Sequence, residues 1–303
     1  MAHDPVMAQE DGRYYLFCTG HGISCMWSDD LEMWHAMKPC LPELPSWIVD
    51  EIPQATPHLW APDIIFHQGQ WHLFYACSLF ATNISVIGHA TSPTLNPDAA
   101  NYGWVDRGMI LRSVPGRDEW NAIDPNIIID DDGTPWMDFG SFWNGMKLVR
   151  LTDDLDAVAK PEEWSTIARR KQNGEIDITQ PGDDAIEAPF IFRKGEWYYL
   201  FVSFDYCCRG KDSDYKTVVG RADNVKGPYV DRDGRLLNAG GGTLLIEGDG
   251  QNTVGVGHCA VYTFGDKDIF AAHAYDANDG SPHLLLRRVE WTDDQWPILK
   301  ELK

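Results

Sequence analysis

Three acidic residues stand at the starts of similar segments of the chain and are the first candidates for chemistry. Asp4 and Asp124 each precede a proline, and Glu187 stands in an Ile-Glu-Ala-Pro segment. If the fold brings them into one cavity, like charges and loss of water raise the pKa of at least one carboxyl. A protonated acid beside an ionised base is the division of labour that hydrolysis of a glycosidic bond requires. The three residues therefore predict a glycoside hydrolase.

The surroundings of each carboxyl along the sequence suggest its role. The segment around Glu187 is the most apolar, and burial favours a protonated carboxyl, so Glu187 is predicted as the general acid. Asp4, beside the polar His3, is predicted as the general base that deprotonates the attacking water. Asp124 is predicted to orient the sugar and to hold the proton on Glu187 through its own negative charge. An inverting enzyme needs its acid and base about 6.5–9.5 Å apart.

Other side chains near these positions are candidates for binding the sugar and a metal ion. Sugars pack their apolar faces on aromatic rings and hydrogen-bond through their hydroxyls. The predicted substrate-binding residues are His3, Trp60, Phe80, Asn126 and Ser141. His258 begins a later segment where the others have acids, and a cavity that holds histidine and carboxylates suits a hydrated calcium ion. His273 is the competing candidate for that ion.

The elements that would position these residues form a repeat. A polar or acidic residue, an apolar strand, a glycine turn and an aromatic strand recur five times, starting near Asp4, Asp63, Asp124, Glu187 and His258. Successive starts are 59, 61, 63 and 71 residues apart, enough for about four short strands each. The repeat predicts an all-β, five-bladed β-propeller, a single domain over residues 1–303, with the leading residues around one channel mouth.

Several details of the repeat remain open at this stage. A β-sandwich with similar hairpins is the alternative fold. Residues after Arg287 or the N-terminal strand are expected to close the ring. The stretch from Asp153 to Trp164 is expected to be partly helical. Asp63 is interpreted as structural, because Trp60 is the residue in phase with Glu187.

Composition excludes several classes of protein. A formal net charge of −21 disfavours nucleic acid, whose phosphates are bound by clustered Lys and Arg. No apolar run is long enough to cross a bilayer, and no secretion signal is visible before Asp4. Seven cysteines lack zinc-site spacing and are expected to be mostly buried thiols. Cys207 and Cys208 are expected on opposite faces of a strand.

The chain resembles glycoside hydrolase family 43, and within it the endo-1,5-α-L-arabinanases. The resemblance rests on His3-Asp4-Pro5, His58–Asp63, Asn121–Asn126, Phe139–Trp143, Ile186–Pro189, Ser203–Gly210, Val218–Arg221, Gly240–Thr243 and Gly257-His258. It implies an inverting mechanism with Asp4 as base, Glu187 as acid and Asp124 as the group that tunes the acid. It also implies that His258 helps to hold a calcium ion through a water shell. One departure is Cys259, where many relatives have asparagine.

The resemblance further implies a substrate and a compartment. The substrate would be linear arabinan, an α-1,5-linked L-arabinofuranosyl chain found as a side chain of pectin, cut by endo action. A secreted or periplasmic monomer is expected from that substrate. The alternatives are an exo-acting arabinanase, an α-L-arabinofuranosidase or a β-xylosidase of the same family. A different class would be an inactive propeller that only binds carbohydrate.

Overall fold

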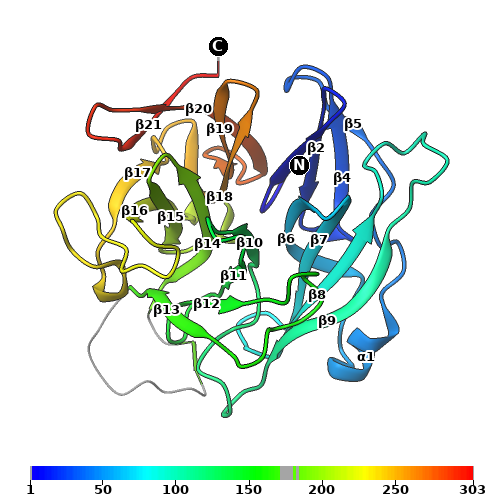
Figure 1. Ribbon diagram of the computed structural model, residues 1–303. Helices are drawn as coiled ribbons and strands as arrows, with labels where there is room; N and C mark the ends of the chain where they lie inside the picture. Colours follow the sequence, from blue (N-terminus) through cyan, green and yellow to red (C-terminus); the bar gives the residue numbers. More distant parts are fainter. Residues whose placement is uncertain (1, 171–179, 182–183, 303) are drawn as a thin grey trace.

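Five antiparallel β-sheets arranged in a ring make up the protein (Figure 1). The computed structural model describes residues 2–170, 180–181 and 184–302. Each sheet is one blade, and its innermost long strand comes first in the chain. The predicted all-β, five-bladed propeller is therefore confirmed, and the β-sandwich alternative is wrong.

The blades follow one another along the chain. Blade 1 contains β1 (Val6–Glu10), β2 (Arg13–Cys18), β4 (Ser24–Ser28) and β5 (His35–Ala36). Blade 2 contains β3 (Gly20–His21), β6 (His58–His67), β7 (Gln70–Ser78), β8 (Ser85–Ser92) and β9 (Val105–Ser113). Blade 3 contains β10 (Asn126–Ile129), β11 (Pro135–Phe139), β12 (Met146–Arg150) and β13 (Trp164–Ala168). Blade 4 contains β14 (Ile186–Lys194), β15 (Trp197–Phe204), β16 (Lys216–Ala222) and β17 (Thr243–Glu247). Blade 5 contains β18 (Thr253–Phe264), β19 (Lys267–Asp276), β20 (Pro282–Trp291) and β21 (Pro297–Lys300).

The hairpin between the first two long strands of each blade turns at a glycine with positive φ, as the repeat predicted. These glycines are Gly12, Gly69, Gly133, Gly195 and Gly265, with φ between 61° and 83°. Glycine adopts the left-handed conformation of a tight turn at little cost, because it has no Cβ. The same kind of glycine turn therefore recurs in all five blades.

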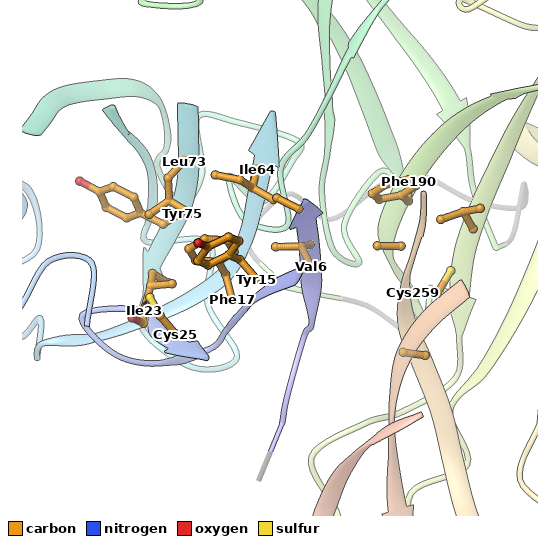
Figure 2. Close-up of a cluster of buried hydrophobic side chains, with 14 of the residues drawn as sticks. Val6, Tyr15, Phe17, Ile23, Cys25, Ile64, Leu73, Tyr75, Phe190 and Cys259 are labelled. Carbon is orange, nitrogen blue, oxygen red and sulfur yellow. Dashed lines mark hydrogen bonds between the residues drawn. The ribbon is translucent and has the colours of Figure 1, made fainter. Parts of the chain in front are cut away.

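The ring closes where its first and last blades pack together. β1 contacts both β6 and β18. The strands after Arg287 stay in blade 5, so the N-terminal strand closes the ring by packing. Figure 2 shows Val6 of β1 with Tyr15 and Phe17 on one side and Phe190 and Cys259 on the other. A large apolar side chain that is fully buried contributes about 1.5–3 kcal/mol, so this cluster ties blade 1 to blades 4 and 5.

Helical structure is scarce among the described residues and lies where the sequence did not indicate it. The helices are α1 (Ser46–Glu51), η1 (Gly210–Asp212) and η2 (Leu237–Ala239). The stretch from Asp153 to Trp164, expected to be partly helical, consists of turns and bends that lead into β13. The Asp154 carboxylate accepts hydrogen bonds from the Thr152 hydroxyl and the Asp156 amide, and such local side-chain bonds compete with a helix. None of the described helices has the length and apolar character that a membrane crossing requires.

Two buried carboxyls, Asp63 and Asp138, lie in the second and third blades. Burial raises the pKa of Asp63 to about 7, although the Ile127 amide donates to it at 2.7 Å. Asp138 is 0% exposed, and neither of its carboxyl oxygens has a hydrogen-bond partner. Burial, reinforced by the charge of Asp63, raises the pKa of Asp138 well above its usual range. The folded protein therefore keeps a proton on Asp138 at a pH where the unfolded chain has lost it.

This retained proton predicts that stability falls as the pH rises. An aspartate in an unfolded chain loses its proton near pH 4, so above that pH each carboxyl that stays protonated on folding costs about 1.4 kcal/mol per pH unit. We expect the melting temperature of the wild type to be lower at pH 8 than at pH 5. The drop should be smaller in Asp138→Asn, whose side chain is neutral throughout. Differential scanning calorimetry measures this, with the exposed Asp266→Asn as the control; an equal drop in Asp138→Asn would contradict it.

Candidate active site

Each inner strand is preceded or interrupted by one residue in the left-handed region, at the same end of the ring. The five residues are Asp4 (φ 52°), Ala61 (φ 44°), Asp124 (φ 57°), Ala188 (φ 53°) and His258 (φ 49°). In blades 2, 4 and 5 the strand register shifts at this point, as in a β-bulge. Residues other than glycine adopt positive φ rarely, and they keep it only where the surroundings hold them there.

Side chains from neighbouring parts of the ring hold these strained residues through their amides. The Thr19 hydroxyl accepts from Ala61 N (2.8 Å), and the Asp124 carboxylate accepts from Ala188 N (3.1 Å). The Ser203 hydroxyl accepts from His258 N (2.8 Å), and His273 Nδ1 accepts from Asp4 N (3.2 Å). In each case the acceptor belongs to the preceding blade, and blade 5 precedes blade 1. The hydrogen bonds that shape the site are therefore also contacts between neighbouring blades.

The repeat predicted from the sequence is one or two residues out of phase in two blades. The repeat places Asp63 and Glu187 at the starts of blades 2 and 4. The residues structurally equivalent to Asp4 and Asp124 are instead Ala61 and Ala188. Glu187 is instead equivalent to Trp60, as the sequence indicated. Asp63 points between blades, where its carboxylate accepts from Asn126 Nδ2 (3.1 Å).

Asp4 is surrounded by hydrogen-bond donors. Thr19 Oγ1 donates to its Oδ2 at 2.5 Å, and both His3 Nδ1 (2.8 Å) and His258 Nδ1 (3.0 Å) lie beside its Oδ1. Burial alone would raise the pKa of Asp4, but the positive charges of His258 and His3 outweigh it and lower that pKa well below its usual range. Asp4 is therefore ionised, which is the form that a general base requires.

Glu187 and Asp124 form a second group of carboxyls. Glu187 accepts hydrogen bonds from the Tyr215 hydroxyl (2.8 Å) and the Ser141 hydroxyl (2.7 Å). Burial raises the pKa of Asp124 well above its usual range; the charge of His258 opposes that rise and the charge of Glu187 adds to it. Asp124 is therefore the carboxyl of this group whose neutral form the surroundings favour.

The burial of these two carboxyls differs from the expectation. Glu187 was expected in the most apolar setting, but its side chain is partly exposed, whereas Asp124 is only 7% exposed. The apolar neighbours of Glu187 in the sequence, Ile186 and Ala188, are both buried. Adjacent residues of a strand point to opposite faces, so those neighbours do not make the surroundings of the Glu187 carboxyl.

His258 lies among the carboxyls and carries positive charge. Burial alone would lower the pKa of His258, but Asp4 and Asp124 raise it to about 9. The described residues contain two close groups of metal-binding atoms, His3 with Asp4 and His273, and His3 with Cys207 and Cys208. His258 belongs to neither group, and calcium prefers oxygen ligands. A calcium ion beside His258 therefore fits these residues only if water supplies most of its ligands.

The predicted substrate-binding residues lie in different environments. His3 contacts Asp4, Trp60 is partly exposed, and Phe80 is 75% exposed between β7 and β8. Ser141 is buried and donates to Glu187, so it positions the predicted acid.

The interpretation of Asn126 as a sugar-binding residue is corrected by the structure. Asn126 is 3% exposed, donates to Asp63 and accepts from Ile191 N (2.9 Å). Its amide is occupied in joining blades 2, 3 and 4, and we assign it that role.

Sequence reasoning missed Thr19, Ser203 and Tyr215, and it considered His273 only as a metal ligand. Thr19, Ser203 and His273 each pair with the residue just before the left-handed one of their own blade, near the end of the second strand or just after it. Their common position near the end of the aromatic strand is a sequence signal that could have identified them. We find no comparable sequence signal for Tyr215, which precedes β16.

Cys207 and Cys208 were expected on opposite faces of a strand, and this is wrong. Both follow the end of β15 in a loop, and Cys208 has a φ of 63°. Cys207 Sγ lies 3.5 Å from Glu187 Oε1, and Cys208 Sγ lies 3.9 Å from His3 Nε2. The other five cysteines are buried thiols, as expected.

Comparison with known proteins matches this arrangement to a family. Residues 1–297 match the family model described as glycosyl hydrolases family 43. The chain is 47% identical over 300 residues to the extracellular exo-α-(1→5)-L-arabinofuranosidase ArbA of Cellvibrio japonicus, covering 99% of this chain and 86% of that protein. It is 37% identical to the extracellular endo-α-(1→5)-L-arabinanase 1 of Bacillus subtilis, covering 98% and 87%.

A solved structure is similar over the same length. The α-L-arabinanase of Cellvibrio cellulosa in complex with arabinohexaose superposes with a TM-score of 0.96 at 46% identity, covering 99% of this chain and 95% of that one. The likeness therefore extends over all five blades.

The ion pair between Asp4 and His258 gives a prediction that can be tested without a substrate. The Asp4→Asn variant removes the negative charge that stabilises the His258 imidazolium, while burial continues to act against it. The pKa of His258 should therefore fall from about 9 towards 6.5, as followed by NMR of the imidazole protons. Asp63→Asn, a buried carboxyl elsewhere, is the control and should leave that pKa near 9. An unchanged value in Asp4→Asn would contradict the pairing.

Proposed function

The chain belongs to glycosyl hydrolases family 43, and from this membership we propose that it hydrolyses α-1,5-linked L-arabinofuranosyl bonds of arabinan with inversion of configuration. The observation that carries the proposal is the meeting of Asp4, Asp124 and Glu187 around His258 at one end of the propeller. The names of the two curated relatives, and the arabinohexaose bound to the solved one, support arabinan as the substrate.

In the proposed reaction Asp4 and Glu187 act on opposite faces of the sugar. Asp4, ionised beside two histidines, accepts a proton from the water that attacks the anomeric carbon. Glu187, which is partly exposed, donates its proton to the oxygen of the leaving sugar as the glycosidic bond breaks. Ser141 and Tyr215 hold the two oxygens of Glu187 and so fix its direction.

Asp124 lies beside the proposed acid, Glu187, and its charge state affects that carboxyl. The sequence predicts that Asp124 holds the proton on Glu187 through its own negative charge, whereas burial and the Glu187 charge raise the pKa of Asp124. We propose that the pair holds one proton before the reaction and that this proton leaves through Glu187. Asp124 also accepts from Ala188 N, which anchors the backbone next to the acid.

The proposal predicts the effect of removing either carboxylate. Glu187→Gln and Asp4→Asn should each lower the rate of hydrolysis of linear arabinan by about 10²–10⁴-fold, the usual contribution of a general acid or base. Release of reducing sugar measures the rate. Glu10→Gln, at the far end of β1, is the matched control. Near-normal rates in either variant, with an unchanged melting temperature, would sink the assignment of these roles. A wild type that does not hydrolyse arabinan would favour the inactive carbohydrate-binding propeller.

The cleavage mode has two candidates. The sequence suggested endo action, and the Bacillus relative is named as an endo enzyme, but the relative with 47% identity is named as an exo enzyme. Endo action on linear arabinan releases a mixed ladder of oligosaccharides, and exo action releases a single small product. Chromatography of the early products therefore separates the two modes.

We include a calcium ion in the proposal as a water-held ion beside His258. Such an ion would supply a second positive charge next to Asp4 and Asp124. If it is present, exhaustive chelation should lower the melting temperature, because an ion bound only by the folded chain stabilises it. If chelation leaves both melting temperature and activity unchanged, and metal analysis finds no calcium, the ion is removed from the proposal.

We also propose that the protein acts outside the cytoplasm. Both curated relatives are named as extracellular, and arabinan is a polymer of the plant cell wall.

A further inference from the structure

Three side chains at the mouth of the site form a group that the proposed reaction does not use. They are His3, Cys207 and Cys208, and their ligand atoms all lie within 4.8 Å of one another. His3 and Cys207 are partly exposed and Cys208 is exposed, so a small ion from solvent can reach the group. The nitrogen comes from blade 1 and the two sulfurs come from the loop after β15, so the group spans the channel mouth between blades.

The loop brings both sulfurs to the same place. In a regular strand, two adjacent cysteines would point to opposite faces. Here Cys208 has a φ of 63°, which turns its side chain back beside that of Cys207. Its amide donates to the Tyr275 hydroxyl at 2.9 Å. The conformation that places two thiols side by side is therefore held by blade 5.

His3 is oriented as a metal-binding histidine usually is. Its Nδ1 lies 2.8 Å from Asp4 Oδ1, and a carboxylate on the far nitrogen is the common partner of a metal-binding imidazole. Its Nε2 faces the thiols, 3.9 Å from Cys208 Sγ, and also contacts the Tyr275 hydroxyl at 2.8 Å. An ion at Nε2 takes the position of a proton there, displaces the Tyr275 hydroxyl and keeps the contact with Asp4.

We propose that His3, Cys207 and Cys208 bind one thiophilic divalent ion of the zinc class, and that the ion-bound protein is inactive. Two sulfurs and one nitrogen suit zinc or cadmium, and they leave the fourth tetrahedral position to water. Calcium, which prefers oxygen ligands, does not compete for this group. Each thiol releases its proton to solvent as it binds. The second half of the proposal rests on the proposed function.

Binding disturbs both ends of the reaction. A Zn–S bond of about 2.3 Å brings two sulfurs on one ion to roughly 3.8 Å, so ligand atoms up to 4.8 Å apart must converge. Cys207 lies 3.5 Å from the Glu187 carboxylate, and His3 holds Asp4, so the convergence moves neighbours of the acid and of the base. A misplacement of about 1 Å in an active site can cost about 10²-fold in rate.

The binding half is tested with cadmium alone, without a substrate. The full chain is treated with a chelator, dialysed and titrated with Cd²⁺ while the ultraviolet absorption of cadmium–thiolate bonds is followed. We expect one equivalent to bind in the wild type and the absorption to disappear in Cys208→Ser. Cys40→Ser is the matched control, because Cys25 and Cys40 form another thiol pair with sulfurs 3.0 Å apart, but both are buried. Absorption that persists in Cys208→Ser, or disappears in Cys40→Ser, overturns the assignment.

The inhibition half is tested with Zn²⁺ during hydrolysis of linear arabinan. Saturating Zn²⁺ should lower the wild-type rate about 100-fold and should leave Cys208→Ser at its own metal-free rate. Cadmium binding without slower hydrolysis under zinc overturns the claim of inactivity. If the metal-free wild type does not cut arabinan, the proposed function fails, while the cadmium titration still decides whether the metal site exists.

Discussion

The site depends on a backbone constraint repeated around the ring: one left-handed residue at the inner end of each blade. Four of these residues donate their amide to a side chain of the preceding blade. Such a residue is strained, and surrounding bonds must hold it. The hydrogen bond that holds a strained residue therefore also joins two blades. Asp4, Asp124 and His258 are themselves such left-handed residues. Assembly of the propeller and placement of the reacting groups are the same event.

Charge at the centre of the ring is balanced locally, although the chain as a whole is strongly acidic. His258 is the cation that Asp4 and Asp124 share, and its pKa rises to about 9 as a result. Asp4 is left ionised, whereas burial raises the pKa of Asp124 well above its usual range. The pKa values of the two aspartates beside this imidazolium are thus separated in opposite directions. The separation requires no difference in residue type between Asp4 and Asp124, only a difference in neighbours.

The sequence predicted the fold well, because hairpin glycines and aromatic strands repeat at blade length. It also identified the three carboxyls, since an acid at the start of an inner strand is visible in the repeat. It could not give the surroundings of those carboxyls. Asn126 is predicted as a sugar contact because it follows a blade-opening residue, but partners from the neighbouring blades occupy its side chain. Cys207 and Cys208 were read as strand residues, because a left-handed turn at a cysteine leaves no pattern in the sequence.

The ring closes at Asp4, and this affects the order in which the site forms during synthesis. Asp4 leaves the ribosome 269 residues ahead of His273, which accepts its amide hydrogen bond. At about 5–20 residues per second, the delay is roughly 13–54 s. During that time the nascent chain already contains Asp4, and later Glu187, but the partners of Asp4 in the fifth blade are still missing. The surroundings of Asp4 are therefore completed only when the last blade folds, so the site forms in the final step of folding.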